Sequence, residues 1–539
     1  MQCKIVCQTI HLFTTKQIFN LFDLKQKVEY KTEILSGLIV AIALVPEAIS
    51  FAMIAGFSPL TGLYAAFVLG IITAIFGGRP GMISGATGAV AVIFLGLINE
   101  LRIANPDITS EGVLQYVFAT VIFAGSIQIL VGILRLGKFI RLVPHPVMFG
   151  FVNGLAIIIF MAQFPNFYQK GSSTLLESTQ FLTMLGFVLL TMLIIWGLPK
   201  ITKAVPSSLV AILVVAGIII GFDINTTTVA DTLNAGESIK GGFPPLTIPN
   251  IGFTWENIKL IMPYAFIMAG VGLIESLLSL NLIDEITETR GKTNRECIAQ
   301  GAGNIASGFL SGMGGCAMLG QSLINISAGA RARLSGIIAA VVLLLFIMFG
   351  SSLIEMLPMA ALVGLMFMVA IGTFEWASLK TFKKMPRIDV IVMVLVTLIT
   401  VITHNLAVAV IIGVVLSALA YSWENAKRIR ARKFVDENGV KHYEIYGPLF
   451  FGSTTGFAEK FDVLTDPEEI IIDFKDSRIA DMSAIEAVNV LTHRYAKQGK
   501  KVHLRHLSKD CILLLKNAEA IVDVNIMEDP NYKVVLDRI

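Results

Sequence analysis

Long runs of apolar residues separated by short polar loops dominate the first four fifths of the chain. A membrane-spanning helix needs about 20 mostly apolar residues. Such runs occur at 33–53, 62–77, 113–134, 147–164, 179–198, 206–221, 257–281, 335–350, 358–372, 388–403 and 405–424. Three further stretches, at 82–98, 296–311 and 314–328, are shorter or are interrupted by glycine. The pattern predicts fourteen spans, an even number that puts both termini on one side.

Near residue 430 the long apolar runs end and charged residues become frequent, so the chain before this point suits lipid and the chain after it suits water. Residues 431–539 hold 33 of the 81 charged side chains. Strands are predicted at 441–449, 469–474 and 501–504, and helices at 456–464, 483–497 (capped by Asp481 or Ser483) and 508–518. This alternation indicates a small α/β domain. The predicted domains are an N-terminal segment (1–30), a transmembrane domain (31–425), a linker (426–439) and the α/β domain (440–539).

Basic residues orient the spans, because loops on the cytoplasmic side are enriched in Lys and Arg. With a cytoplasmic N-terminus, the inner loops hold fifteen basic residues and the outer loops four. The sequence therefore predicts a multi-pass protein of the plasma (inner) membrane with both termini cytoplasmic. Residues 1–30 have no signal-peptide pattern. Their apolar residues alternate with lysines, which fits either a helix lying on the membrane or an irregular terminus without a role.

Composition and motifs argue against other classes of protein. The net charge of +3 is too small and dispersed for nucleic acid binding. The five cysteines are scattered and form no disulfide or metal-binding pattern. The sequence 291–293 (GKT) resembles the end of a P-loop, but Ile286 stands where glycine is required. We therefore expect neither an enzyme nor a bound cofactor or metal, other than a transported ion.

Two glycine-rich breaks interrupt the spans in corresponding places. One is 81–88 (GMISGATG) and the other is 312–318 (GMGGCAM), seven spans apart. Paired broken spans mark the site of an inverted-repeat transporter. Two helix N-termini meeting in mid-membrane would favour an anion. The alternative is close helix packing through small residues.

Two carboxylates lie inside predicted spans. A carboxylate there costs about 2.5–3.5 kcal/mol on insertion scales and so marks a functional candidate. Glu275 has Ser279 one turn later, and the pair suits Na⁺ or a carried proton. The alternative for Glu275 is a structural cap on a neighbouring broken helix. Glu47 follows Pro46, which breaks the hydrogen bonding of its helix; it either lines the site or has a structural role.

Several segments together resemble the SulP (sulfate permease) family of anion transporters, known in animals as solute carrier family twenty-six. They are 45–52 (VPEAISFA), 62–64 (GLY), 76–78 (FGG), 84–88 (SGATG), 294–296 (NRE), 301–304 (GAGN) and 329–336 (GARARLSG). The tail resembles the STAS domain that ends most members.

The resemblance implies a fold, a movement and an assembly. It implies a seven-plus-seven inverted repeat in which spans 1–4 and 8–11 form a core and spans 5–7 and 12–14 a gate. It further implies an elevator-like movement of the core and a homodimer, with the STAS domain available to a cytoplasmic partner.

The resemblance also implies site residues between the third and tenth spans. The expected substrate contacts are Glu47, Phe51, Ala86, Thr87, Gly88, Cys316, Ala317, Met318, Gln321 and Ser322. The expected cation-coupling residues are Glu275, Ser279 and Gly315. Ser483 aligns with a serine that is phosphorylated in related STAS domains, although a helix-capping role is the alternative.

Two departures from the family pattern bear on function. Gln321 stands where many members carry arginine, so that a fixed positive charge is missing. Glu47 replaces a glutamine common in sulfate permeases. We therefore predict a symporter of a small inorganic anion, sulfate or bicarbonate, driven by Na⁺ or H⁺. The alternatives are a dicarboxylate carrier, and an anion channel or an anion sensor that signals through the STAS domain.

Overall fold

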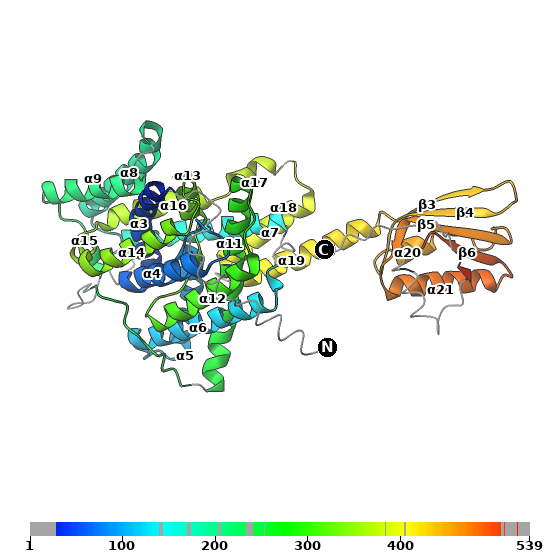
Figure 1. Cartoon of the computed structure of the whole chain (residues 1–539), viewed down its shortest axis with the longest axis horizontal. Helices are drawn as coiled ribbons and strands as arrows, with labels where there is room; N and C mark the ends of the chain where they lie inside the picture. The colour runs from blue at the N-terminus through cyan, green and yellow to red at the C-terminus, as the bar shows by residue number, and fades with distance from the viewer. Residues whose placement is uncertain are drawn as a thin grey trace. The chain divides into compact units, whose positions relative to one another are not determined.

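The computed structural model describes residues 29–138, 144–169, 174–202, 206–232, 241–252, 254–382, 384–403, 406–507, 511 and 525–526. The chain forms two compact units, Met1–Val414 and Val415–Ile539 (Figure 1). The predicted N-terminal segment and the helix at 508–518 lie outside the described residues, apart from Glu29, Tyr30 and Cys511.

All fourteen predicted spans correspond to helices, which confirms the multi-span fold. The first seven spans are α3 (Tyr30–Ile54), α4 (Pro59–Phe76), α5 (Gly88–Ala104), α6 (Ser110–Ile133), α7 (His145–Met161), α8 (Ser178–Ile201) and α9 (Ser207–Gly221). The last seven are α11 (Trp255–Thr287), α12 (Thr293–Phe309), α13 (Leu319–Ser327), α14 (Leu334–Phe349), α16 (Met359–Thr373), α18 (Arg387–Thr403) and α19 (Leu406–Ala426). Short helices α10 (Val229–Thr232), α15 (Ser351–Glu355), α17 (Trp376–Thr381) and η3 (Phe164–Phe167) lie in the connections.

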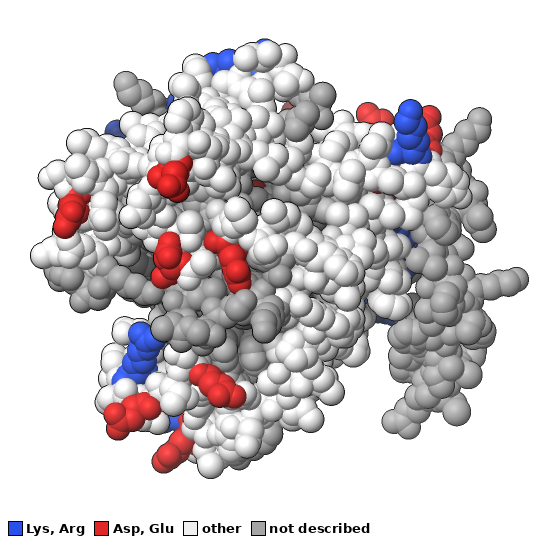
Figure 2. Space-filling model, turned by 90° about the vertical axis from the view of Figure 1, so that its left-hand side faces the viewer, with Lys and Arg blue, Asp and Glu red and all other residues white. Residues whose placement is uncertain are grey.

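Lipid exposure explains where the apolar side chains lie. Seven of the described helices are individually long and apolar enough to cross a membrane. On α8 and α18, large apolar residues such as Leu193, Trp196 and Ile402 are more than half exposed. Figure 2 shows one side of the molecule on which uncharged residues predominate and charged groups are few. Such surfaces are stable against hydrocarbon rather than water.

Helices seven spans apart make equivalent contacts. The contact of α6 with α12 corresponds to that of α14 with α4, since α14 is the equivalent of α6 and α4 that of α12. In the same way, the contact of α11 with α6 corresponds to that of α3 with α14. Likewise, α7 packs on α18 as α16 packs on α8. Exchanging the first seven spans with the last seven reproduces each contact, so the two halves are structural repeats. Equivalent helices are seven places apart in the order of spans, and successive spans cross in alternate directions, so the repeats have opposite orientations in the membrane.

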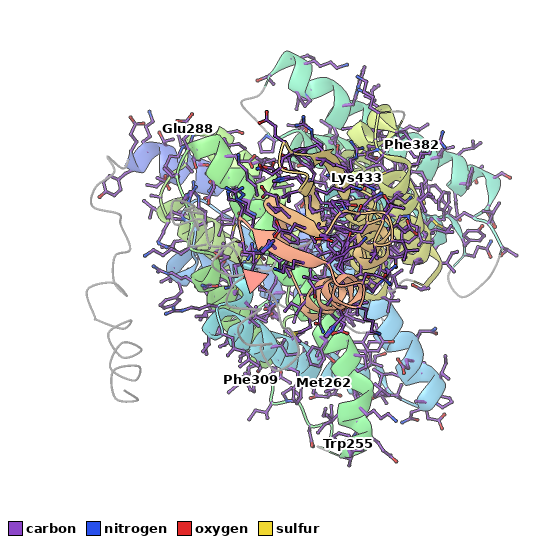
Figure 3. The ribbon with its side chains drawn as sticks, turned by 90° about the vertical axis from the view of Figure 1, so that its right-hand side faces the viewer. Trp255, Met262, Glu288, Phe309, Phe382 and Lys433 are labelled. Carbon is purple, nitrogen blue, oxygen red and sulfur yellow. The ribbon has the colours of Figure 1, made fainter. Side chains whose placement is uncertain are left out.

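The helices group into the two expected bundles. Helices α3–α6 and α11–α14 pack mainly on one another and form the core, whereas α7, α8, α9, α16 and α18 form the gate. The bundles touch chiefly where α3 meets α16 and α9, and where α5 meets α7. Helix α11 runs the full depth of the core: Figure 3 shows Trp255 and Glu288 at opposite ends, with Phe309 of α12 toward the Trp255 end.

Glycine allows the core helices to approach closely. A Cβ atom on Gly125 of α6 would lie 2.5 Å from the carbonyl oxygen of Gly301 on α12. A Cβ atom on Gly301 would likewise lie 2.5 Å from the carbonyl oxygen of Gly125. In the gate, Gly154 of α7 faces Thr400 and Gly364 of α16 faces Thr191. Close packing of small residues is a main source of helix association in lipid.

The second unit is a small α/β domain, as expected. Its five-stranded sheet has the order β3 (Arg430–Val435), β4 (Lys441–Leu449), β5 (Glu469–Ile479), β6 (Lys501–Arg505) and β7 (Asn525–Ile526). β3 and β4 are antiparallel, and the other pairs are parallel. Its apolar core includes Phe457, Ile472 and Val488. Helix α21 (Met482–Ala496) begins after Asp481, whose side chain accepts from the amide of Ala484 and is the cap.

Three predictions for this unit were wrong in detail. The strand predicted at 469–474 continues to Ile479 in β5. The segment 430–435 was predicted as linker but forms β3, an edge strand whose exposed basic residues hide the alternation of a strand. The helix predicted at 456–464 ends early, since α20 spans only Thr454–Ala458. Beyond it the chain turns into a loop held by side chains of the sheet and of α21.

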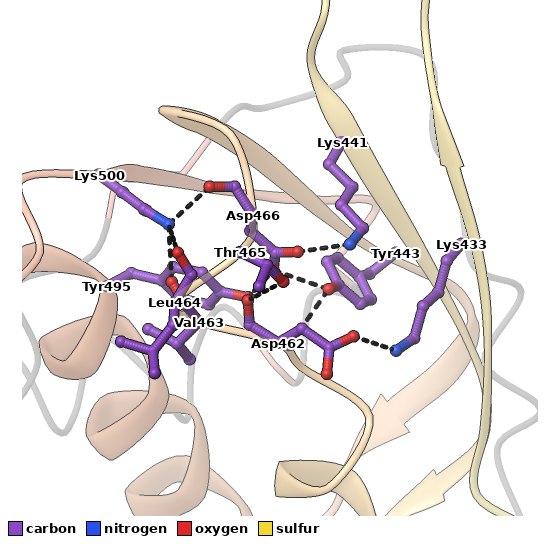
Figure 4. Close-up of polar contacts among 10 residues, drawn as sticks. All are labelled: Lys433, Lys441, Tyr443, Asp462, Val463, Leu464, Thr465, Asp466, Tyr495 and Lys500. Carbon is purple, nitrogen blue, oxygen red and sulfur yellow. Dashed lines mark hydrogen bonds and ion pairs between the residues drawn. The ribbon is translucent and has the colours of Figure 1, made fainter.

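Asp466 organises this loop (Figure 4). Its carboxylate accepts hydrogen bonds from the Tyr443 and Tyr495 hydroxyls and pairs with the Lys441 ammonium group. The side chain of Asp466 is fully buried. Burial alone would raise the pKa of Asp466, but the bonds from Lys441, Tyr495 and Tyr443 outweigh it and hold the pKa below its usual value. Lys500 adds bonds to the carbonyl groups of Val463 and Leu464.

We predict that Asp466→Asn destabilises the second unit by about 2 kcal/mol, because it removes the charged acceptor of a buried network. Because the pKa of Asp466 is lower in the folded than in the unfolded chain, its ionised carboxylate stabilises the fold fully at pH values above the unfolded pKa near 4. This stabilisation is lost as the pH falls through the folded pKa. The wild-type advantage over the variant should therefore shrink in acid. Urea-dependent proteolysis of the tail in the purified full chain measures this.

The matched control is Asp462→Asn. Asp462 pairs with Lys433 near the surface, with a side chain 57% exposed, and exposed pairs contribute little. Equal losses for the two variants would contradict the role assigned to Asp466.

Candidate functional site

The two glycine-rich breaks meet as a pair of two-residue antiparallel strands. Strand β1 (Ser84–Gly85) pairs with β2 (Cys316–Ala317), with Ser84 opposite Ala317. The chains approach so closely that a Cβ atom on Gly315 would lie 1.9 Å from the carbonyl oxygen of Gly85. The two breaks therefore form a single crossing inside the core, which we call the strand crossing.

A helix begins directly after each of these strands. Helix α5 follows its N-cap Thr87 and α13 follows its N-cap Met318, and neither N-cap side chain bonds to its helix. The first helical hydrogen bonds are donated by Ala91 and Ser322, so the amides of 88–90 and 319–321 have no partner within the helix. These amides carry the positive end of the helix dipole. The strand crossing thus places two anion-attracting helix ends in the core.

Thr87, Cys316 and Glu275 are joined by successive hydrogen bonds beside the crossing. The Cys316 thiol donates to Oε2 of Glu275 over 2.7 Å. On its other side, Sγ of Cys316 lies 3.3 Å from Oγ1 of Thr87, and either atom can be the donor. Thr87 and Cys316 are buried, whereas Glu275 is partly exposed. A predicted anion contact is thereby connected to the predicted cation-coupling residue.

The second carboxylate approaches from α3. Oε1 of Glu47 accepts a hydrogen bond of 2.9 Å from Nε2 of Gln321 on α13. The side-chain oxygen of Gln321 is buried and bonded to no described residue. Phe51, one turn beyond Glu47, lies at the start of α5: a Cβ atom on Gly88 would be 3.0 Å from its ring.

The site has two carboxylates and no basic partner for either among the residues that the structure describes. Glu47 and Glu275 are bonded to an amide and a thiol, respectively. No described lysine or arginine forms an ion pair with them; the one ion pair described in the first unit joins Arg79 to Asp284. Among the groups described at the crossing, the two helix ends are therefore the source of positive potential.

Of the other two predicted cation-coupling residues, Ser279 lies one turn from Glu275 on α11 and Gly315 directly precedes Cys316. Ser279 is buried on the same α11 face as Glu275, and its hydroxyl bonds to no described residue. The backbone of Gly315 is held by Asn304 of α12, which accepts from its N–H at 2.9 Å and donates to its carbonyl at 3.0 Å. Their roles with a cation remain predictions.

The remaining predicted substrate contacts lie at the crossing, whereas the predicted phosphorylation site lies in the other unit. Ala86, Ala317 and Met318 are buried at the crossing. The Ser322 hydroxyl accepts from the amide of Ile83 and donates to its carbonyl. Ser483 belongs to the other unit, where it is exposed in the first turn of α21.

Polar residues that support the crossing were not predicted as site residues. The Ser276 hydroxyl accepts from the amide of Ala317, and the Ser307 hydroxyl accepts from that of Gly314. Asn304 also donates to Gln128 of α6. The available signal was an amide or hydroxyl side chain in the middle of an apolar span, where an unsatisfied polar group is costly.

Comparison with known families covers both units. The description "Sulfate permease family" matches residues 30–397, and "STAS domain" matches residues 433–528. YbaR of Bacillus subtilis, whose name proposes a sulfate transporter, is 40% identical over 92% of this chain and 99% of its own. The bicarbonate transporter BicA of Picosynechococcus is 30% identical over 82% of each chain.

Solved structures agree with the fold. The transmembrane domain of a cyanobacterial BicA superposes with a TM-score of 0.62 at 29% identity, covering 71% of this chain and 98% of that one. The overall structure of SLC26A9 superposes with a TM-score of 0.76 over 92% of this chain and 87% of that one. At 18% identity, SLC26A9 supports the fold alone.

We predict that Gly315→Ala disrupts the site, since its methyl group would collide with the Gly85 carbonyl and force the strands apart. Anion uptake by reconstituted protein should fall at least about tenfold, in line with the cost of misplacing a binding group. Gly372→Ala, near the end of the gate helix α16, is the control, because nothing lies within 4 Å of the added atom. Uptake that is equal in the two variants would show that the crossing does not need close contact.

Proposed function

Because this chain belongs to the sulfate permease family, we propose that it moves a small inorganic anion across the plasma membrane by symport with Na⁺ or H⁺. The family and the described spans make it a membrane-embedded transporter. Sulfate and bicarbonate are the candidate substrates, since one relative's name proposes sulfate transport and another is named a bicarbonate transporter.

The observation that carries the anion site is the pair of helix ends at the strand crossing. Amides of 88–90 and 319–321 have no helical partners, and such groups bind oxyanions without a basic side chain. The residues nearest these ends are small or uncharged, including Ala86, Thr87 and Gly320. Geometry rather than a charged side chain then selects the anion, which suits a compact inorganic ion.

Charge balance supports symport. An anion beside the ionised Glu47 and Glu275 would be repelled, and each helix end contributes only about half a positive charge. Protonation or a bound Na⁺ at Glu275 removes part of this repulsion. The Ser279 hydroxyl and the carbonyl of Gly315 are oxygen groups that Na⁺ accepts as ligands, and a proton needs the carboxylate alone.

The two bundles support an elevator-type movement. The core holds both halves of the site, while the gate contacts it through few helices. An apolar cavity of about 400 Å³ lies between α3 and α14 of the core and α9 of the gate. Small, apolar contact surfaces oppose sliding less than interlocked polar ones. We propose that the core carries the anion and its cation together past a gate fixed in the bilayer.

We further propose a homodimer with both termini in the cytoplasm. Exposed apolar surface on the gate helices α8 and α18 offers room for a second copy as well as lipid. In the STAS unit, Ser483 is exposed at a helix N-terminus, where a phosphate group is electrostatically favoured. The unit is therefore a candidate contact for a cytoplasmic partner.

Uptake into proteoliposomes tests the function. Labelled sulfate and labelled bicarbonate are offered separately, with an inward Na⁺ gradient, an inward proton gradient or neither. We expect one anion to accumulate under one of the gradients, and unlabelled competitors, including dicarboxylates, to rank the substrates. Anion accumulation that is the same with and without each gradient would rule out symport.

We predict that Glu275→Gln abolishes gradient-driven uptake, at least about a hundredfold, while the protein stays folded. The amide keeps the shape of the side chain and an acceptor for the Cys316 thiol but cannot carry a proton or bind Na⁺ as a carboxylate does. Glu285→Gln, an exposed position on the same helix, should transport normally. Wild-type uptake by Glu275→Gln would refute the assigned role.

A further inference from the structure

The Cys316 thiol stands between the two parts of the site. It donates to Glu275 over 2.7 Å and lies 3.3 Å from the hydroxyl of Thr87. The side chain is fully buried, and its backbone is fixed opposite Gly85 in the strand crossing. Thr87 in turn is the N-cap of α5, whose free amides form half of the anion site. The three side chains therefore form one continuous hydrogen-bonded chain.

This chain can be ordered in two ways, because the thiol and the hydroxyl each carry one proton. With an ionised Glu275, the thiol donates to the carboxylate and the Thr87 hydroxyl donates to Sγ. Both protons are then engaged within the chain, and neither is available to an anion at the start of α5. With Glu275 neutralised by a proton or Na⁺, the thiol loses its charged acceptor. It can then donate to Oγ1 of Thr87, and the hydroxyl proton turns toward the helix end.

We propose that the Thr87–Cys316–Glu275 chain couples the two ligands. A cation at Glu275 reverses the direction of the hydrogen bonds in the chain, and the Thr87 hydroxyl is then free to donate a hydrogen bond to the anion. This inference rests on the proposed function, because it assigns a mechanism to symport at the same site. Cys316 is a positioning residue that acts through Thr87, which donates to the anion.

Neighbouring polar groups are engaged elsewhere. The Ser276 hydroxyl is bonded to the amide of Ala317. Two other carboxylates of the core have partners of their own: Glu47 binds Gln321, and Glu296 of α12 binds the amide of Gly78. Among the described residues, no basic side chain reaches Glu275 by a hydrogen bond or an ion pair. The thiol is thus the direct hydrogen-bonded route from Glu275 to the start of α5.

Linkage between the ligands tests the proposal. Binding of sulfate and of bicarbonate to the purified full chain is measured by calorimetry, in sodium and in choline buffer, at acidic and at neutral pH. In wild type, one cation should tighten binding of one anion. Cys316→Ala should reduce that cation effect by about tenfold, the size expected for a lost hydrogen bond to a charged group. Cys316→Ser, which keeps a donor and acceptor, should retain most of the effect.

A second arm interrupts the chain at its other end. Thr87→Val should lose the linkage as Cys316→Ala does, and Thr87→Ser should keep it. The double variant Cys316→Ala/Thr87→Val should be no worse than either single variant, since residues that act in one chain are not additive. Cys297→Ala is the control: this thiol is buried on α12 outside the chain.

Each outcome decides the matter. Full linkage in Cys316→Ala, loss of linkage in Cys316→Ser, or additive losses in the double variant would overturn the coupling role while symport stands. If Cys316→Ala does not fold, the Thr87 variants decide alone. A wild-type protein whose anion binding ignores both cations would overturn the proposed symport and this inference with it.

Discussion

The need to satisfy every backbone polar group inside a membrane governs this structure. Two spans are broken in mid-membrane, and the exposed backbone there is tolerated only because other parts of the chain bond to it. The strands β1 and β2 pair with each other, Asn304 holds both polar groups of Gly315, and Ser276, Ser307 and Ser322 bind nearby amides. Among the described residues, the amides in the first turns of α5 and of α13 stay without a helical partner, and this is where we propose that the anion binds.

The two repeats are alike in packing but differ at the site. Helices α3 and α11 occupy equivalent places, and each brings one carboxylate toward the crossing, yet Glu47 meets an amide while Glu275 meets a thiol. A symmetric scaffold therefore surrounds an asymmetric set of polar groups. Under the proposed function, this difference would let one repeat take the larger share in binding a cation, while both would offer a helix end to the anion.

The spans could be predicted from the sequence because long apolar runs have few interpretations in a chain with so few charges. The two breaks followed from their glycines, and the tail's fold from alternating strands and helices. The partners of the breaks could not be found this way: Asn304 and Gly315, or Cys316 and Glu275, meet only when several helices pack together. Edge strand β3 was missed because its outward residues are basic, and the helix at 456–464 was too long because Asp466 holds a loop there.

The two-residue ladder between β1 and β2 has a thermodynamic consequence. It joins the broken spans of both repeats and so ties together the two halves of the proposed anion site. In an elevator movement, the site would then keep its shape whether it opens outward or inward, and its affinity would be nearly equal on the two faces. Such a carrier is reversible by construction: the concentrations of anion and cation on the two sides, rather than a change in the protein, would set the direction of net flow.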